Sequence, residues 1–492
     1  MTVKKSHAGE LLSHSVIYGL GIILNKSVNF ILLPLYTNYF PPEQIGLFTL
    51  VQSISLFLGV IYTFGLETSF MKYFIEADDL KRKSEIYSSV LISLLATSFL
   101  LSFLIFSFSG SISSFFKFED VTEGGSLIRI MSIVILIDTL YRFPLLLFRA
   151  DLNTKTYTYL NIFTFTVNLL CNLIFIAVLK KGVESIFYSY IISAFVTFAV
   201  GLLITRKYLT LKISASDIKE LFVYGNKFIY IGIFLILIDM SDRFFLKYYF
   251  DESLVGIYWA NYRLATVMSL LISAFRFSWT PYFLNLASNP DNKKIISGIF
   301  TYFVFAGLLL FVVFSIFMDQ IVSLNFFGFN FLDVKYWSGI SIVPVVMLAY
   351  FLSGLYSVLN AAPFFTDKTG SLFAFALSGL LINLLLNFLL IPKTGIMGAA
   401  FSTLLTYGFM TVIIYIYSQR IYNISYDWKK IRVIILMSII VFVTGYYFVN
   451  GFNISSVWIF LINVILVVSY LTALNKLKIV ELQKFKKVFN KN

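Results

Sequence analysis

The feature that most constrains this chain is a series of about fourteen apolar segments, each about twenty residues long. A helix of about twenty residues, rising about 1.5 Å per residue, crosses a hydrocarbon core about 30 Å thick. The pattern predicts an all-α polytopic membrane protein whose function depends on polar residues inside the membrane. The expected spans are 12–35, 45–66, 86–108, 126–148, 157–179, 184–204, 220–241, 255–277, 296–318, 338–360, 371–391, 397–417, 432–449 and 456–474.

Composition agrees with this reading and excludes several classes of protein. Hydrophobic residues make up 59% of the chain and charged residues 13%, whereas soluble proteins are about a quarter charged. Cys171 is the only cysteine, and the two histidines, His7 and His14, lie near the N-terminus. We therefore expect no disulfide, no metal site and no cofactor. A Walker A loop requires a Gly-Lys dipeptide, which the sequence lacks, so a P-loop ATPase is excluded.

Lysine and arginine alternate between successive connections, which predicts orientation because cytoplasmic loops carry the positive excess. The richer connections contain Lys4, Lys5, Lys72, Lys81, Arg82, Lys83, Arg149, Lys155, Arg206, Lys207, Lys212, Lys219, Lys293, Lys294, Lys368, Arg420, Lys429 and Lys430. The poorer set contains Lys117, Lys180, Lys181, Lys247, Lys335 and Lys393. The C-terminal tail adds Lys476, Lys478, Lys484, Lys486, Lys487 and Lys491 to the richer set. The resulting bias of roughly four to one predicts fourteen crossings with both termini in the cytoplasm.

The placement of the basic residues also accounts for the net charge of +13. Nucleic-acid binding requires a clustered soluble basic patch, which we do not find, so no nucleic-acid partner is expected. The outer connections are too short for an external catalytic domain, so the chain is not expected to be an enzyme. Residues 475–492 form a basic cytoplasmic tail that is expected to attract membrane lipid.

The sequence contains an internal repeat with an offset of about 206 to 215 residues. Tyr18-Gly19 opens the first span and Tyr224-Gly225 the seventh. Residues 39–48 correspond to residues 249–258, with Gly46 matching Gly256. Other matches relate Ser69-Phe70 to Ser278-Trp279, and the pair Asn168 and Asn172 to the pair Asn383 and Asn387.

Each repeat contains six spans, so both halves start from the same side and form parallel repeats with a transport path between them. We therefore predict an N-terminal six-helix lobe at 1–211 and a C-terminal six-helix lobe at 212–420. Residues 421–474 are expected to add two further transmembrane helices.

At this point the chain resembles the polysaccharide/oligosaccharide flippase branch of the multidrug/oligosaccharidyl-lipid/polysaccharide exporter superfamily. The resemblance lies in Tyr18-Gly19 with Pro34-Leu35-Tyr36, in Asp242-Arg243-Phe244-Phe245-Leu246 with Gly256-Ile257-Tyr258, and in residues 395–400, Gly-Ile-Met-Gly-Ala-Ala. It implies two six-helix lobes in a V around a central cavity. It also implies transfer of undecaprenyl-diphosphate-linked oligosaccharide across the bacterial cytoplasmic (inner) membrane, for O-antigen (lipopolysaccharide) or capsule assembly.

Charged residues inside membrane helices are costly and usually face a cavity or a partner. Lys26, Lys227 and Arg263 have no acidic residue three or four positions away, and they lie on spans that face the cavity in this superfamily. With Arg142, they are the candidate ligands of a substrate diphosphate, because cations bind phosphate and arginine can offer two donors. A snorkelling or tyrosine-capped cation is the alternative.

Other buried polar residues suggest packing, gating or ion coupling. Asp138 and Arg142, like Asp239 and Arg243, are four apart on one helix face and can neutralise each other. Residues that could contact sugar or pack helices together are Asn29, Asn168, Asn172, Asn383 and Asn387, with packing favoured. Residues that could bind a coupling H⁺ or Na⁺ are Glu67, Asp138, Asp239 and Asp242. The repeat also suggests a cytoplasmic gate formed by Glu67 and Arg276. Pro34, Pro144 and Pro344 are candidate hinges.

The leading hypothesis is a flippase for lipid-linked oligosaccharide that works by alternating access, with a polysaccharide polymerase and chain-length machinery as candidate partners. One alternative is a multidrug or cation antiporter of the same superfamily, although its cationic substrates would favour unpaired acids. A peptidoglycan lipid-precursor flippase is a close alternative. A membrane polysaccharide polymerase or glycosyltransferase fits less well, because it needs a catalytic site in a sizeable loop.

The predicted orientation can be tested with reporter fusions. Fusions after residues 120 and 333 should report the outer side, and fusions after residues 80 and 213 the cytoplasm, because lysine and arginine set the orientation of neighbouring spans. A reversed pattern at either pair would refute the assigned spans and, with them, the parallel repeat.

Overall fold

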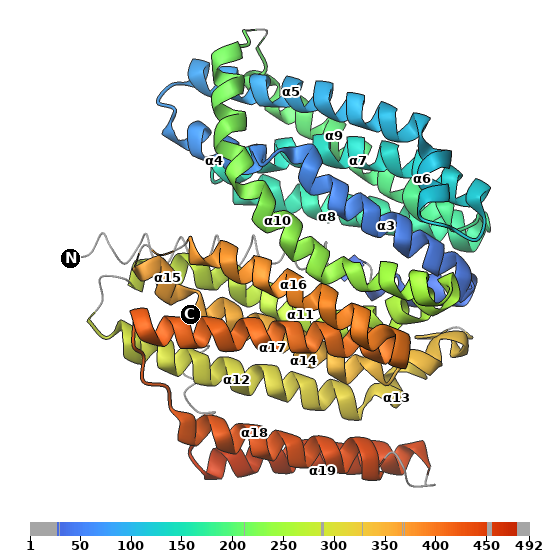
Figure 1. Cartoon of the computed structure of the whole chain (residues 1–492), viewed down its shortest axis with the longest axis vertical. Coiled ribbons are helices and arrows are strands. Elements are labelled where there is room, and N and C mark those ends of the chain that lie inside the picture. Colours follow the sequence, from blue (N-terminus) through green and yellow to red (C-terminus); the bar gives the residue numbers. More distant parts are fainter. Residues whose placement is uncertain are drawn as a thin grey trace. The chain divides into compact units, whose positions relative to one another are not determined.

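The computed structural model describes residues 27–28, 30–210, 212–286, 290–326, 328–366, 368, 370–449 and 455–479. These residues are almost entirely helical (Figure 1), as the apolar segments predict. The elements of the first half are α2 (Leu33–Tyr39), α3 (Pro42–Thr63), α4 (Leu66–Glu76), α5 (Leu80–Ser107), α6 (Ser109–Phe115), α7 (Val121–Ala150), α8 (Thr154–Asn172), the π-helix η1 (Leu173–Val178), α9 (Glu184–Thr205) and the 3₁₀ turn η2 (Arg206–Tyr208).

The second half begins with two long helices and contains one short hairpin of strands. Its elements are α10 (Ala215–Tyr249), α11 (Glu252–Leu286), α12 (Asn292–Ile316), α13 (Met318–Val322), β1 (Asn325–Phe326), β2 (Phe329–Asn330), the 3₁₀ helix η3 (Val334–Gly339), α14 (Ile342–Leu359), α15 (Ala361–Phe365), α16 (Ser371–Thr394), α17 (Ile396–Ile421), α18 (Trp428–Val443), the π-helix η4 (Thr444–Val449) and α19 (Ser456–Lys476). Strands β1 and β2 pair antiparallel, with Asn325 opposite Asn330.

In the described part of the chain, eleven helices are long and apolar enough to cross a membrane. They coincide with predicted spans two to six and nine to fourteen. The seventh and eighth spans lie in α10 and α11, whose 35 residues each extend about 52 Å at 1.5 Å per residue. The first span, 12–35, lies mostly outside the described residues, so the predicted count of fourteen is approximate.

The chain divides into two compact units. The first contains Met1–Arg263 and Ala376–Ser402, and the second contains Leu264–Phe375 and Thr403–Asn492. In the first unit, α7 packs against both α5 and α9. In the second unit, α12 packs against α14 and α18, and α18 against α19. The lobe boundaries predicted from the repeat stay a prediction.

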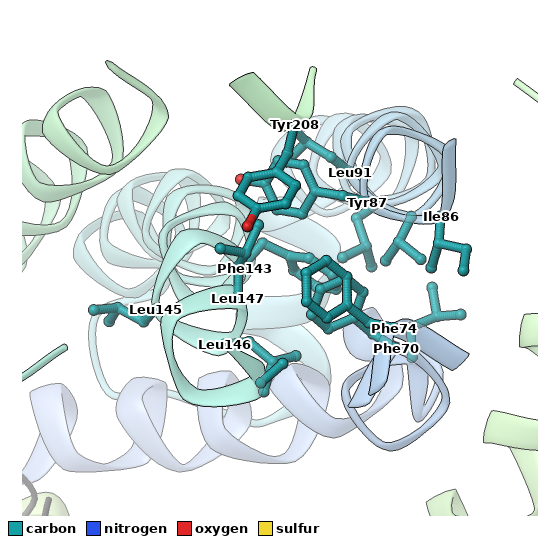
Figure 2. Packing of buried hydrophobic residues seen from close by; sticks show 14 of the residues in the cluster. Phe70, Phe74, Ile86, Tyr87, Leu91, Phe143, Leu145, Leu146, Leu147 and Tyr208 are labelled. Atoms are coloured by element: carbon teal, nitrogen blue, oxygen red, sulfur yellow. The ribbon is translucent and has the colours of Figure 1, made fainter. Parts of the chain in front are cut away.

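The core of the first unit contains a cluster of buried aromatic residues from α4, α5, α7 and η2 (Figure 2). The Phe70 ring lies 5.0 Å from that of Phe74 and 5.7 Å from that of Phe143. The Tyr87 hydroxyl lies 3.0 Å from the Thr205 hydroxyl, so its one polar atom is satisfied. Packing and internal hydrogen bonds hold helices together where lipid surrounds them, because lipid offers no hydrophobic drive between helices.

The hinge predictions for Pro34 and Pro344 stay predictions. Pro344 lies in the first turn of α14, where the missing N–H has no helical partner to lose. Pro34 follows a turn at Leu32 that separates the helical residues Phe30 and Ile31 from α2. Pro144 does lie inside α7, which continues through it from Val121 to Ala150. The second predicted span is interrupted at Phe64 and Gly65, which separate α3 from α4. Their φ angles of 46° and 67° lie in the left-handed region.

Two glycines allow α3 and α11 to approach backbone to backbone. A Cβ at Gly46 would overlap the carbonyl oxygen of Glu252, and a Cβ at Gly256 would overlap the carbonyl oxygen of Pro42. Both overlaps involve the residue four positions before the opposing glycine. Such a reciprocal pattern is what a local twofold axis produces, and these glycines are equivalent positions of the sequence repeat.

The start of α11 is also tied to the connection between α6 and α7. The Glu119 carboxylate accepts from the Glu252 N–H and from Lys247 Nζ, each at 3.0 Å. In return, the Glu119 N–H donates to Glu252 Oε1 at 3.0 Å. The Glu252 N–H and the Lys247 ammonium lower the pKa of the Glu119 carboxyl. Glu119 therefore positions the helix terminus that crosses α3.

Replacing Gly46 or Gly256 with alanine should lower the thermal unfolding midpoint of the detergent-purified protein. The added methyl group meets backbone oxygen, and overpacking of this kind costs about 1–3 kcal/mol. Gly59→Ala, on the same helix α3, is the matched control, because no atom lies within 4 Å of the position where its Cβ would be placed. Equal midpoints for all three variants would contradict the close approach.

Candidate functional site

Of the four cations predicted to bind diphosphate, two have described side chains. Lys26 and the neighbouring Asn29 lie outside the described residues. Lys227 belongs to α10, but its side chain is also outside the described part. The geometry can therefore be built around Arg263 and Arg142.

Arg263 extends from α11 and meets a side chain of α3. Its Nη2 donates to Gln52 Oε1 at 3.1 Å, and its guanidinium lies 5.2 Å from the centre of the Trp259 ring. Trp259 is one turn earlier on α11, and an aromatic face attracts a cation without neutralising it. A side-chain amide and an indole ring thus orient the guanidinium.

The surroundings of Trp259 connect this arginine to the first helices of the chain. The Tyr36 ring lies 6.3 Å from the Trp259 ring, and the Phe48 ring lies edge-on to it at 6.2 Å. The Tyr36 hydroxyl donates to Asn172 Oδ1 at 3.0 Å. The guanidinium therefore belongs to a group of side chains that comes from α2, α3, α8 and α11.

The Asn pairs form buried hydrogen-bonded networks of matching geometry in the two repeats. Asn172 Nδ2 donates to Asn168 Oδ1 at 3.1 Å, and Asn387 Nδ2 donates to Asn383 Oδ1 at 3.0 Å. Ser241 of α10 donates to Asn383 Oδ1 at 2.8 Å. All four asparagines are buried, so these contacts favour helix packing over sugar binding.

A buried ion pair lies near the end of α10. Arg243 Nη1 lies 2.8 Å from Asp242 Oδ1, and the Tyr258 hydroxyl donates to Asp242 Oδ2 at 2.6 Å. Arg243 also donates to the backbone carbonyl of Asp239 and lies 4.9 Å from the centre of the Tyr262 ring. The sequence spacing had suggested the Asp239 carboxylate as the partner, whereas the ion pair in the structure joins Arg243 to the adjacent Asp242.

Arg142 is the centre of a second charged cluster. It lies 2.7 Å from Asp138 Oδ2, as the four-residue spacing predicts, and 3.7 Å from Glu67 Oε1. The Tyr190 hydroxyl donates to Asp138 Oδ1 at 2.6 Å. Two carboxylates around one guanidinium leave this cluster with more negative than positive groups, which favours Arg263 as the stronger candidate for phosphate binding.

The residues of the predicted gate each have other partners. Arg276 donates to Ser357 Oγ at 2.6 Å, to Ser353 Oγ at 2.7 Å and to the Ser353 carbonyl oxygen at 2.9 Å. Glu67 faces Arg142, as described above. The pairing of Glu67 with Arg276 therefore stays a prediction. Within the described ranges, no group of three or more His, Cys, Asp or Glu side chains is placed to hold a metal ion.

Sequence reasoning missed the partners of Arg263 and Asp242. Gln52 offered a signal, since it is the one amide in the apolar stretch from Leu47 to Tyr62. Trp259 and Tyr258 offered little, because aromatic residues are abundant throughout the chain and their spacing does not distinguish a ligand from packing.

The comparisons with known proteins agree with this architecture. Residues 40–283 match a family model described as polysaccharide biosynthesis protein. An uncharacterised membrane protein of Methanocaldococcus jannaschii is 23% identical, and the match covers 96% of each chain.

Two solved structures share the fold. A lipid II flippase, MurJ, in an inward closed conformation aligns with a TM-score of 0.74 at 16% identity, covering 94% of this chain and 100% of that one. An inward-facing multidrug resistance MATE transporter of the MOP superfamily aligns with a TM-score of 0.68 at 14% identity, covering 86% and 99%. These matches show that the chain shares the fold of these two transporters.

Removing the Asp242 carboxylate should destabilise the protein strongly. Asp242→Ala leaves the Arg243 charge buried without its carboxylate, which typically costs about 3–5 kcal/mol. Glu85→Ala, which removes a carboxylate 3.7 Å from the half-exposed Arg82, should cost at most about 1 kcal/mol. Thermal unfolding in detergent measures the loss of stability in both single variants. The double replacement Asp242→Leu with Arg243→Met should recover most of the stability that Asp242→Ala loses. A midpoint for Asp242→Ala equal to that of Glu85→Ala would refute the buried pair.

Proposed function

We propose that this protein is a flippase that moves undecaprenyl-diphosphate-linked oligosaccharide from the inner to the outer leaflet of a bacterial cytoplasmic membrane. The observation that carries the proposal is the Arg263 guanidinium, oriented by Gln52 and Trp259 on a helix of the exporter fold. The family model matched by residues 40–283 points to polysaccharide biosynthesis. Export of repeat units for O-antigen or capsule then follows as the cellular role.

The physical problem of such a transporter is the headgroup. The lipid tail stays in the bilayer, while a diphosphate and several sugars must cross a medium that solvates neither. A guanidinium compensates the diphosphate charge by charge-assisted hydrogen bonds, and its planar fork matches two phosphate oxygens. Lys26 and Lys227 are proposed as further phosphate ligands along the same path, with Arg142 as a weaker candidate.

Alternating access supplies the movement. The two lobes expose the cavity to one side and then to the other, and no bond is made or broken. The Glu67–Arg276 pair is proposed to close the cytoplasmic side in one of the two states. Coupling to H⁺ or Na⁺ would use Glu67, Asp138, Asp239 or Asp242, whose carboxylates lie in or beside the apolar spans. A polymerase and its chain-length machinery are proposed to take up the product.

A second candidate is the transfer of a peptidoglycan precursor, which the structural similarity to a lipid II flippase favours. The name of that relative indicates a lipid cargo. The proposed binding of a diphosphate by Arg263 applies equally to any diphosphate-linked lipid. The similarity to a multidrug transporter also keeps a cation antiporter open. Arg263 argues against cationic drugs, because like charges repel in a low-dielectric cavity.

Transfer can be measured with the full chain in proteoliposomes that contain an undecaprenyl-diphosphate-linked oligosaccharide. Arg263→Ala should lower the rate by about tenfold or more, because a hydrogen bond to a charged group contributes about 1.5–3 kcal/mol. Arg263→Lys should keep partial activity, since the charge remains without the fork. Lys26→Ala should also lose transfer.

The matched control is Arg149→Ala, which removes an exposed arginine at the end of α7 and should leave the rate unchanged. Lipid II and a cationic dye, offered in parallel, separate the three candidate functions. Normal oligosaccharide transfer by Arg263→Ala, or transport of the dye alone, would refute the proposal.

A further inference from the structure

The second unit contains a polar pocket that is lined by none of the residues proposed above for transport. It has a volume of about 530 Å³ and is lined by Lys293, Lys294, Ser297, Asn423 and Ser425. This volume falls in the range of about 300–1,000 Å³ that is usual for small-molecule sites. The lysines and Ser297 belong to the first turns of α12, and the other two residues to the connection between α17 and α18. No predicted site residue lines the pocket.

Hydrogen bonds hold the two walls of this pocket together. The Ser297 hydroxyl donates to the Ser425 carbonyl oxygen at 2.8 Å. The Tyr422 hydroxyl donates to Asn292 Oδ1 at 2.7 Å, and Lys293 Nζ lies 4.7 Å from the centre of the Tyr422 ring. The side chain of Asn292 is buried. The pocket is therefore a built feature of the junction between α12 and the α17–α18 connection.

The charge around the pocket favours an anion. The segments 291–297 and 419–432 contain six basic and two acidic residues: Lys293, Lys294, Arg420, Lys429, Lys430 and Arg432 against Asp291 and Asp427. Asp427 is largely engaged, since its carboxylate caps α18 by accepting from the Lys430 N–H at 3.1 Å. The first N–H groups of α12 add the positive end of a 25-residue helix.

Aromatic residues beside the pocket indicate its depth. The Trp428 ring lies 5.6 Å from that of Tyr415 and 6.3 Å from that of Tyr426, and the Tyr426 ring lies 4.6 Å from that of Phe300. Tryptophan and tyrosine gather at the membrane–water interface. The three helices α12, α17 and α18, which are all apolar enough to cross a membrane, have an end here. The pocket thus lies at headgroup level, on the side that the lysine and arginine bias predicts to be cytoplasmic.

We propose that this pocket binds the phosphate headgroup of an anionic phospholipid of the surrounding membrane. Basic pockets between transmembrane helices on the cytoplasmic side bind such headgroups. Lipid is favoured over free phosphate because the pocket opens at the depth where lipid phosphates are concentrated. Lys293 and Lys294 supply the charge attraction, while the hydroxyls and amide at the rim offer hydrogen bonds to phosphate and glycerol oxygens. The inference goes beyond transport and does not depend on the cargo.

The test compares lipids retained by the full chain after purification from membranes of mixed phosphatidylglycerol and phosphatidylcholine. Wild type should be enriched in phosphatidylglycerol, and Lys293→Gln with Lys294→Gln should lose that enrichment. Each lysine near an anionic surface contributes roughly a fivefold factor in affinity, so the pair should lower affinity roughly 25-fold. The variant Lys293→Arg with Lys294→Arg should preserve the phosphatidylglycerol enrichment. The matched control is Lys180→Gln with Lys181→Gln, an adjacent exposed pair in another connection.

A second measurement separates lipid from free phosphate and from misfolding. In lipid-free detergent, the Lys293/Lys294 and the Lys180/Lys181 glutamine variants should both keep the wild-type thermal unfolding midpoint. Added phosphatidylglycerol should raise the midpoint of wild type and of the Lys180/Lys181 variant, but not that of the Lys293/Lys294 variant. An equal rise with excess inorganic phosphate would identify a free-phosphate site and overturn the lipid assignment. Unchanged phosphatidylglycerol enrichment in the Lys293/Lys294 glutamine variant, or equal retention of both lipids by wild type, would also overturn it.

Discussion

The contact on which the first unit most depends is the backbone approach of α3 and α11 at Gly46 and Gly256. Each glycine faces a carbonyl oxygen one turn before the other, so neither position has room for a Cβ. This approach sets the start of α11, which the Glu119 and Glu252 contacts also hold. From Gly256, about two further turns of α11 lead through Trp259 to Arg263, which lies beside Gln52 of α3. A contact of glycine backbones thus determines where the candidate phosphate ligand lies.

The charged and amide side chains within the apolar spans follow one rule, which is that the membrane core leaves no water to solvate them. Arg243 is satisfied by Asp242 and by tyrosine faces, and Arg142 by two carboxylates and their tyrosine partner. The asparagine pairs are satisfied by each other and by serine or tyrosine hydroxyls. Arg263 contacts the Gln52 amide and the Trp259 ring.

Basic residues have two roles in this protein that depth separates. Those in the connections are predicted to set the orientation and to attract anionic lipid, and Lys293 and Lys294 of α12 line the polar pocket beside the α17–α18 connection. Those within the spans are fewer, and of them Arg142, Arg243 and Arg263 have specific partners in the structure. The net charge of +13 is therefore consistent with a membrane protein and needs no nucleic acid to explain it.

The sequence by itself determined the helical membrane fold, the approximate spans, the repeat and the residues that carry buried charge. These follow from local length and composition, because a hydrocarbon core demands about twenty apolar residues for each crossing. The Asp138–Arg142 pair and the asparagine pairs were also predictable, since four-residue spacing places side chains on one helix face. Only the tertiary structure decided that Gln52 contacts Arg263, 211 residues away, and that Glu67 lies beside Arg142. It also decided that the helical segment is interrupted between α3 and α4, at Phe64 and Gly65. Partners on separate helices depend on how those helices pack, which spacing along one helix does not determine.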